Sequence, residues 1–269
     1  MADYTLSGIY IYPIKSLGGI QVKEALVEKR GLQYDRRWML IDEKGNFLTQ
    51  RKFAHMALLQ VEIAAAGLLV SHKQQKLPPL QIPFEANDEK TKLVSIWNDV
   101  CFAFEVNNEA NAWFSEALGM PCKLVHMPDN AIRHVDPEYA RPKDLVSFAD
   151  AYPFMMIGQE SLNDLNSRLS EALPMNRFRP NLVFTGGGAF DEDTWTELAI
   201  GDTTFFPVKP CARCVVTTIN QETAEQSAEP LKTLATYRTQ NNKVNFGQNL
   251  IHNGTGTTLK VGQLLQIID

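Results

Sequence analysis

The first hundred residues consist of short runs rich in β-branched, aromatic and alternating apolar side chains, and this pattern restricts the fold more than any other feature. Turn-forming residues separate the runs, as in the segment 42–46. The expected strands are 5–12, 22–27, 38–42, 47–50, 58–64, 68–72, 94–97 and 100–106. So many short strands at close spacing predict a β-barrel or a β-sandwich.

The second half of the chain mixes strands with a few helices. Apolar side chains recur at the helical spacing from residue 110 to 118, with Asn107 or Asn108 available to cap the start and Gly119 the end. The expected helices are 110–118, 161–173 and 230–238, and the expected strands are 154–157, 181–185, 198–200, 204–208, 214–219 and 259–268. The chain is therefore predicted to be mainly β with a few flanking helices.

A long loop is expected from residue 127 to 146, because Pro128, Pro137 and Pro142 and charges of both signs interrupt any regular pattern. Loops of that length carry function or connect domains. We therefore predict two domains, residues 1–125 and 126–269.

The overall charge excludes some classes of partner. The chain carries 26 basic and 31 acidic residues, a net charge of −5, which argues against a general nucleic-acid-binding protein. No apolar run approaches the ~20 residues of a membrane span. The N-terminus lacks the basic start and apolar stretch of a signal peptide. We expect a cytoplasmic protein that binds neither nucleic acid nor a membrane.

Two of the four cysteines, Cys211 and Cys214, form a C-x-x-C pair. Two thiols at this spacing can bind a metal or form a redox disulfide, but a single C-x-x-C is also compatible with structural cysteines. A zinc site usually needs a second pair, and Cys122 with His126 is a weak candidate. The spacing alone leaves a metal or catalytic thiol, a zinc site and structural cysteines open.

Positive charge recurs where expected strands begin or end. Lys15 and Ser16 follow the first strand, Arg36 and Arg37 precede another, and Arg177 and Arg179 precede a third. Lysine and arginine are natural partners of phosphate. One such segment is more typical of a solvated surface, but three of them in an acidic protein favour a local anion site.

Taken in order, several segments resemble the MOSC family, named for the C-terminal domain of molybdenum-cofactor sulfurase, and within it the branch of the mitochondrial amidoxime-reducing component and its bacterial relatives. The segments are YPIKS at 12–16, DRRW at 35–38, RPKD at 141–144, SLNDLNSRL at 161–169, FRPN at 178–181, CARC at 211–214, EPLKTL at 229–234, FGQ at 246–248 and VG at 261–262. No single segment is decisive, but the ordered set spans nearly the whole chain and is highly specific.

The resemblance implies a fold and a cofactor. It implies a β-rich MOSC_N module over 1–125 packed on a MOSC β-barrel over 126–269, with the molybdenum cofactor between them. In this family the second cysteine of the pair supplies the molybdenum thiolate, which here is Cys214. The positions that match those holding the pterin and its phosphate are Lys15, Ser16, Arg36, Arg179, Asn181 and Arg213, with Asp150 near the site.

The activity implied by the resemblance is reduction of N-hydroxylated compounds such as amidoximes, hydroxylamines and N-hydroxylated bases. The sequence has no C-x₄-C-x₂-C ferredoxin pattern, so electrons are expected from an external donor: a ferredoxin, a flavodoxin or a flavoprotein reductase. The alternatives are a non-catalytic carrier of the cofactor or of sulfur, and a small zinc-binding protein.

Overall fold

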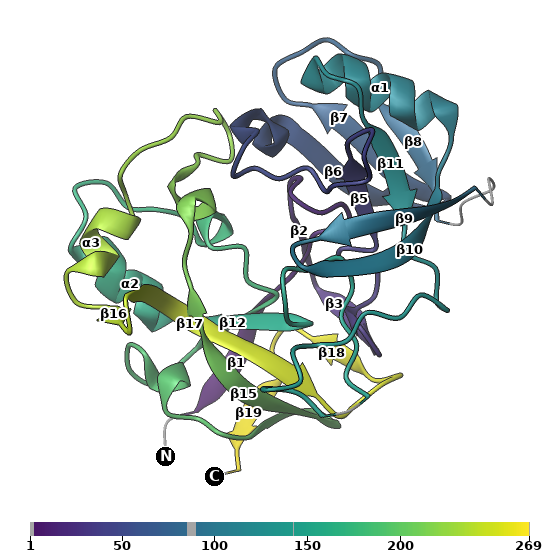
Figure 1. The fold of residues 1–269 in the computed structure, drawn as a ribbon. Helices are drawn as coiled ribbons and strands as arrows, with labels where there is room; N and C mark the ends of the chain where they lie inside the picture. The colour runs from purple at the N-terminus through teal and green to yellow at the C-terminus, as the bar shows by residue number, and fades with distance from the viewer. Residues whose placement is uncertain (1–2, 85–89, 142, 269) are drawn as a thin grey trace.

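The computed structural model describes residues 3–84, 90–141 and 143–268. Two β-rich regions lie side by side, one built around α1 and β5 to β11, the other around α2, α3 and the strands from β12 onward (Figure 1). The prediction of a mainly β protein with few helices is confirmed.

Seven strands form a closed barrel in the second region. In order around the barrel these are β12 (Phe154–Gly158), β13 (Leu182–Thr185), β1 (Tyr4–Ile11), β19 (Leu264–Ile267), β14 (Leu198–Ile200), β15 (Thr203–Ala212) and β17 (Lys243–His252). The barrel closes because β12 pairs with both β13 and β17. Only the β12–β13 pairing is parallel. Closure removes the exposed strand edges that an open sheet would present.

A bulge in β1 directs its apolar residues into the barrel core. Leu6 and Ile9 are three positions apart, so in a regular strand their side chains would point to opposite faces. The register with β13 shifts between Leu6 and Gly8, which adds one residue and brings both side chains into the same core. Phe154 and Phe205, whose ring centroids are 5.1 Å apart, pack in that core.

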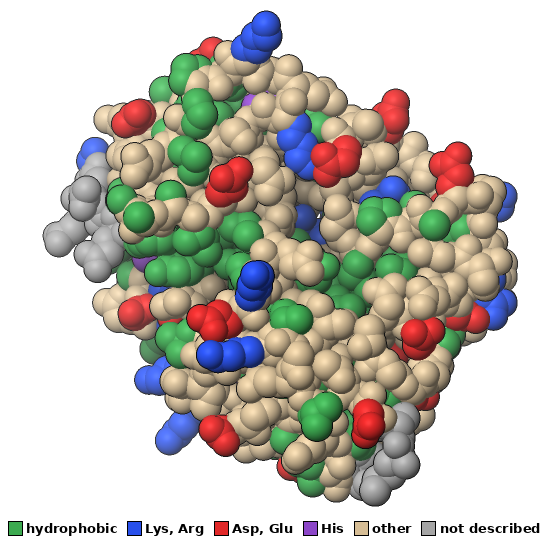
Figure 2. Space-filling view, turned by 180° about the vertical axis from the view of Figure 1, so that it is seen from behind, with side chains coloured by type: hydrophobic (Ala, Val, Ile, Leu, Met, Phe, Trp, Pro, Cys, Tyr) green, Lys and Arg blue, Asp and Glu red, His purple; other side chains and the backbone are tan. Residues whose placement is uncertain are grey.

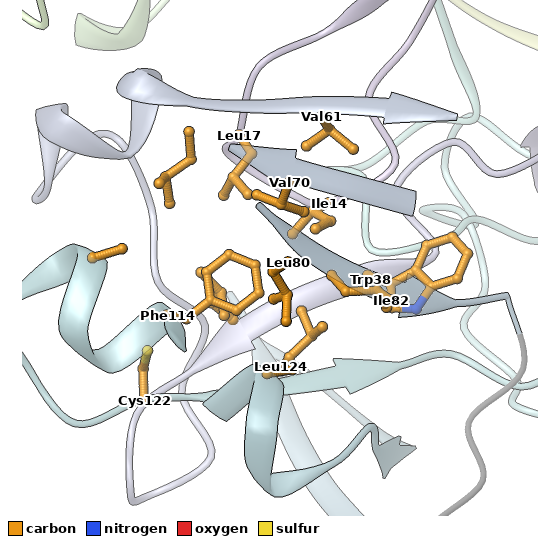
Figure 3. Close-up of a cluster of buried hydrophobic side chains, with 14 of the residues drawn as sticks. Ile14, Leu17, Trp38, Val61, Val70, Leu80, Ile82, Phe114, Cys122 and Leu124 are labelled. Atoms are coloured by element: carbon orange, nitrogen blue, oxygen red, sulfur yellow. The ribbon is translucent and has the colours of Figure 1, made fainter. Parts of the chain in front are cut away.

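The first region contains two small sheets and a helix. One sheet has the order β5 (Trp38–Ile41), β11 (Lys123–His126), β10 (Asp99–Glu105) and β9 (Thr91–Ile96). The other has β6 (Leu59–Ala64), β7 (Gly67–His72) and β8 (Leu80–Pro83), with a 3₁₀ turn at Ala54–Leu58 before it. Trp38, Leu80 and Phe114 meet in the core between these sheets and α1 (Figure 3).

The helix α1 (Asn108–Leu118) has the caps that the sequence predicts. The Asn107 side chain accepts a hydrogen bond from the backbone N–H of Ala110 at 2.7 Å. Gly119 ends the helix in the left-handed conformation, which glycine adopts without a steric penalty.

The beginning of the chain belongs to both regions. The strand β1 lies in the barrel, and β2 (Ile20–Val22) pairs with it. The sheet of β3 (Glu24–Glu28), β4 (Gly31–Leu32) and β18 (Thr258–Lys260) also joins early and late segments. Between these strands, Ile14 forms a bridge with Trp38 of the first region. The segment around Lys15 therefore lies at the junction of the two regions, while the domain division after residue 125 stays a prediction.

The long loop is present, and the short helices are shorter than expected. Among the described residues, no named helix or strand lies between β11 and β12. The helices α2 (Gln159–Ser167) and α3 (Leu231–Ala235) replace the predicted 161–173 and 230–238. The last turn predicted for α2 is absent. The Asn166 side chain donates to the Leu173 carbonyl and accepts from the Leu173 backbone N–H, and these two bonds stabilise a loop after the helix.

The predicted strand 214–219 is wrong, since Val215–Thr218 forms a 3₁₀ turn. Its β-branched residues favour a strand, but two hydroxyls compete for the backbone carbonyls. Thr217 Oγ1 donates to the Cys214 carbonyl at 3.0 Å, and Thr218 Oγ1 donates to the Val215 carbonyl at 2.7 Å. This turn fixes the backbone directly after Cys214.

Several other strand assignments differ from the prediction: β8, β11 and β16 (Thr239–Gln240) were not predicted, and the predicted strand 259–268 is divided into β18 and β19. The segment 47–50 contributes only an isolated bridge between Ile41 and Phe47. The strand β17, which closes the barrel, was not predicted because polar residues such as Asn245 and Gln248 interrupt its apolar pattern. Both side chains are nevertheless buried. The short β16 forms a hairpin with β17. None of the described helices has the length and apolar character needed to cross a membrane.

The barrel core should dominate the stability of the second region. Leu182 of β13 is fully buried, whereas Leu264 of β19 is 59% exposed. We expect Leu182→Ala to lower the free energy of unfolding by about 2–5 kcal/mol, because it leaves a cavity in a closed core. The matched change Leu264→Ala should cost less than about 0.5 kcal/mol. Urea unfolding followed by circular dichroism measures both, and equal losses would contradict this account.

Candidate functional site

All eight residues predicted for the site line one cavity of about 380 Å³. They are Lys15, Ser16, Arg36, Asp150, Arg179, Asn181, Arg213 and Cys214. They come from loops after β1, before β5, before β12, before β13 and after β15. The space-filling view shows Lys and Arg atoms lying in a hollow of the surface (Figure 2).

Lys15 and Asp150 form an ion pair across the junction of the two regions. Lys15 Nζ lies 2.6 Å from Asp150 Oδ1 and donates to the Phe148 carbonyl at 2.7 Å. Burial lowers the pKa of Lys15 to about 8, although the Asp150 carboxylate opposes that shift. Burial alone would raise the pKa of Asp150, but Lys15 and Arg51 outweigh it and hold that pKa below its usual value.

Arg36 and Arg179 lie together on the ring of Tyr12. Each guanidinium carbon is 4.2 Å from the ring centroid, and the Tyr12 hydroxyl donates to the Pro180 carbonyl at 3.0 Å. Arg36 also bonds to Asp35 at 2.6 Å and to the Asn181 side-chain oxygen at 3.1 Å. Burial lowers the pKa of Arg179 to about 10, which leaves it charged at neutral pH.

Three of the predicted residues have left-handed backbone conformations. The φ angles are 68° at Ser16, 49° at Arg36 and 57° at Arg179. Side chains other than glycine, asparagine and aspartate rarely adopt this region, and such strain concentrates at functional sites. The surrounding fold must hold these backbones in place, and in doing so it directs the three side chains toward the cavity.

The two cysteines of the pair have different neighbours. The Cys211 sulfur lies 3.0 Å from Nη1 of the Arg213 guanidinium. Nη2 of the same guanidinium donates to the Phe178 carbonyl at 2.5 Å. Cys214 follows β15 and accepts a hydrogen bond from Arg51 Nε at 3.3 Å. Both thiols are free and partly exposed. Cys214 is therefore accessible from the cavity, as its predicted role requires.

The cavity has an excess of positive charge. Its lining includes six cationic side chains, Lys15, Arg36, Arg51, Arg179, Lys209 and Arg213, and two carboxylates, Asp136 and Asp150. This difference of four positive charges occurs in a protein whose net charge is −5. The concentrated charge favours an anionic ligand.

Part of the donor capacity in the cavity is unused. Within the described ranges, the Arg179 guanidinium donates no hydrogen bond and lies over the Tyr12 ring. The Nε atom of Arg213 is buried without a hydrogen-bond partner. Buried donors normally have partners, so these groups fit an anion with several acceptor oxygens. Together with the thiol of Cys214, the donor set fits a phosphorylated pterin that binds a metal.

Sequence reasoning missed several residues of the cavity, above all Arg51. Its guanidinium contacts both Cys214 and Asp150, and Asp150 raises its pKa although burial opposes that shift. The sequence contains a signal for Arg51, because it directly follows the expected strand 47–50. The other predicted cations of the site were found by the same position next to an expected strand. Lys209, which lies 3.9 Å from the Tyr139 ring centroid, carried no comparable signal within β15.

The zinc alternative gains no support. The part of the chain that the structure describes holds no group of three or more His, Cys, Asp or Glu side chains able to bind a metal ion. Cys122 lies in the apolar core of the first region near Phe114 (Figure 3) and does not line the cavity.

Two family models match most of the chain. The model of the MOSC N-terminal beta barrel domain matches residues 3–121, and that of the MOSC domain matches residues 143–266. The chain is 35% identical over 248 residues to the mitochondrial amidoxime-reducing component 1 of *Mus musculus*, covering 87% of this chain and 71% of that protein. The human protein of the same name is also 35% identical over 248 residues, with 72% of it covered.

A second kind of relative is much longer. The molybdenum cofactor sulfurase of *Oryza sativa* subsp. *japonica* is 32% identical over 266 residues, which is 92% of this chain but only 32% of that protein. The chain thus spans about a third of that relative's length. These matches show that the chain belongs to the MOSC family, and the resemblance seen in the sequence is confirmed.

The lowered pKa of Lys15 predicts a pH dependence of anion binding. With a folded-state pKa of about 8, Lys15 loses its charge as the pH rises from 7 to 9, whereas Arg179, with a pKa of about 10, stays mostly charged. Inorganic sulfate, which does not titrate in this range, should therefore bind up to roughly tenfold more weakly at pH 9 than at pH 7. Calorimetry of the wild type and of Lys15→Met tests this, because the variant should bind weakly without that pH dependence. An equally steep decline in the variant would contradict the assignment.

Proposed function

We propose that this protein is a molybdenum-cofactor-dependent reductase of N-hydroxylated compounds, the class that includes amidoximes, hydroxylamines and N-hydroxylated bases. The observation that carries the proposal is the convergence of the Cys214 thiol and six cationic side chains on one cavity. The amidoxime-reducing names of the relatives at 35% identity support the same reaction class.

The residues of the cavity would divide the work of binding. Lys15, Arg36, Arg179 and Arg213 would hold the phosphate and pterin of the cofactor through charged hydrogen bonds, with Ser16 and Asn181 contributing polar contacts. Cys214 would supply the soft thiolate ligand to molybdenum. When bound, the cofactor supplies the two-electron chemistry that removes the oxygen from an N-hydroxyl group.

Asp150 is suited to holding the cationic wall in position. Its carboxylate accepts hydrogen bonds from Lys15 at the junction and from Arg51 and the indole N–H of Trp97 in the first region, so three side chains converge on one residue before β12. Because its pKa lies below the usual value, Asp150 stays ionised at neutral pH and is not suited to donate a proton there.

The assignment of Cys214 can be tested by substitution. The protein is produced in a cell that makes the molybdenum cofactor, and benzamidoxime reduction is measured with reduced methyl viologen as the electron source. We expect Cys214→Ser to keep its circular dichroism spectrum and to lose reduction to background, because the substitution removes the soft thiolate proposed to bind the metal. Cys211→Ser is the matched control and should keep most of the activity. Reduction by Cys214→Ser that depends on the cofactor would refute the assignment.

We further propose that electrons come from a separate protein, a ferredoxin, a flavodoxin or a flavoprotein reductase. The four cysteines in the sequence provide no iron–sulfur pattern. The purified, cofactor-loaded protein should therefore not oxidise NADPH in the presence of benzamidoxime, and should do so when a flavoprotein reductase is added. Sustained NADPH oxidation by the protein alone, followed at 340 nm, would contradict this expectation.

A second candidate is a carrier of the cofactor or of sulfur, and the sulfurase relative favours it. The same cavity would then bind the cofactor without turning over a substrate. Molybdenum and pterin in the purified protein without benzamidoxime reduction, or a persulfide on Cys214 found by mass spectrometry, would support the carrier.

A further inference from the structure

Arg51 connects the two regions at the sulfur of Cys214. Its Nε donates to Cys214 Sγ at 3.3 Å, and its Nη2 lies 3.0 Å from Asp150 Oδ2. Within residues 3–84, 90–141 and 143–268, no other side chain donates a hydrogen bond to this sulfur. The planar fork of arginine allows one guanidinium to serve both partners, which a lysine cannot do in the same geometry.

The Trp97 ring packs against the Arg51 guanidinium. The Arg51 guanidinium carbon lies 4.3 Å from the Trp97 ring centroid, and the indole Nε1 donates to Asp150 Oδ1 at 3.3 Å. The Phe47 ring supports the indole, with centroids 4.8 Å apart. Arg51 is therefore held by a ring on one face and by two acceptors at its edge.

Trp97 reaches Arg51 from the tip of the hairpin formed by β9 and β10. Trp97 lies at the turn between β9 and β10, with a φ of 56° and a side chain that is 47% exposed. An aromatic residue in the left-handed conformation is strained, and an exposed Arg–Asp pair by itself contributes little to stability. The two-residue hairpin turn accounts for the positive φ, and the exposed ring at its tip contacts Arg51 and Asp150.

A hydrogen bond and a positive charge at a metal-bound sulfur stabilise the reduced, more electron-rich state of the metal. We propose that Arg51 is a positioning residue that acts through the Cys214 sulfur and raises the reduction potential of the metal bound there, with Trp97 fixing Arg51 in place. This inference rests on the cofactor assignment in the proposed function. It does not depend on which substrate the protein reduces.

The test is a redox titration of the cofactor-loaded protein, followed by the paramagnetic signal of the half-reduced metal. We expect Arg51→Met to shift the midpoint potential to a more negative value. The half-reduced metal forms in a one-electron step, for which a tenfold change in the ratio of oxidised to reduced metal corresponds to ~59 mV. Arg51→Lys keeps the charge but not the fork, so its potential should lie between those of the wild type and Arg51→Met.

Arg168→Met is a matched control, because Arg168 also pairs with an aspartate, Asp164 at 2.9 Å, and lies 4.2 Å from the ring centroid of Tyr237. It does not line the cavity, so its loss should leave the potential unchanged. Trp97→Ala, which retains Arg51, should shift the potential in the same direction as Arg51→Met and by less. This variant carries the test if Arg51→Met does not fold.

Two results would overturn the inference: a wild-type potential in both Arg51→Met and Trp97→Ala, or an equal shift in Arg168→Met. The failure of the proposed function looks different, since the wild-type protein itself would then lack molybdenum or fail to reduce benzamidoxime. If the wild type carries the cofactor and is active but Arg51→Met and Trp97→Ala have unshifted potentials, the role of Arg51 is refuted and the proposed function still stands.

Discussion

The mutual repulsion of six cationic side chains around one cavity is the constraint on which the rest of the site depends. Gathering that charge in a partly buried space costs free energy unless fixed carboxylates and dipoles offset it. Asp35 lies behind Arg36, and Asp150 lies between Lys15 and Arg51. Asp150 lines the cavity, whereas Asp35 is buried beside Arg36, and removing either carboxylate would leave a cation without its ion pair.

The junction of the two regions is where this charge is held. The chain leaves the barrel after β1 and forms the bridge between Ile14 and Trp38. Lys15 follows directly and therefore lies between the two regions. Arg133 strengthens the opposite wall, because its guanidinium donates to the carbonyls of Ser147, Ala149 and Asp150 and pairs with Asp99 of β10. Neither region alone contains the complete set of side chains, which explains why a β-rich first region and a closed barrel occur together in one chain.

The strained backbones at Ser16, Arg36 and Arg179 are a second consequence of that arrangement. A regular strand or turn would direct these side chains along the sheet or into solvent. The left-handed conformation redirects them, and the closed barrel and the packed core beneath Trp38 supply the rigidity that keeps them there. Stability elsewhere in the molecule thus offsets strain at the site.

The sequence by itself determined the local chemistry: the mainly β class, the capped helix from Asn108, the cysteine pair and the cations at strand ends, because these depend on nearest neighbours and short-range periodicity. It also identified the family through an ordered set of short segments. Only the tertiary structure decided that β17 closes the barrel and that Arg51 and Trp97 belong to the site. Those outcomes depend on contacts between residues far apart in the chain: a polar strand is stabilised by pairing with β12 and β15, and Arg51 reaches a sulfur 163 positions away. No local pattern encodes such contacts.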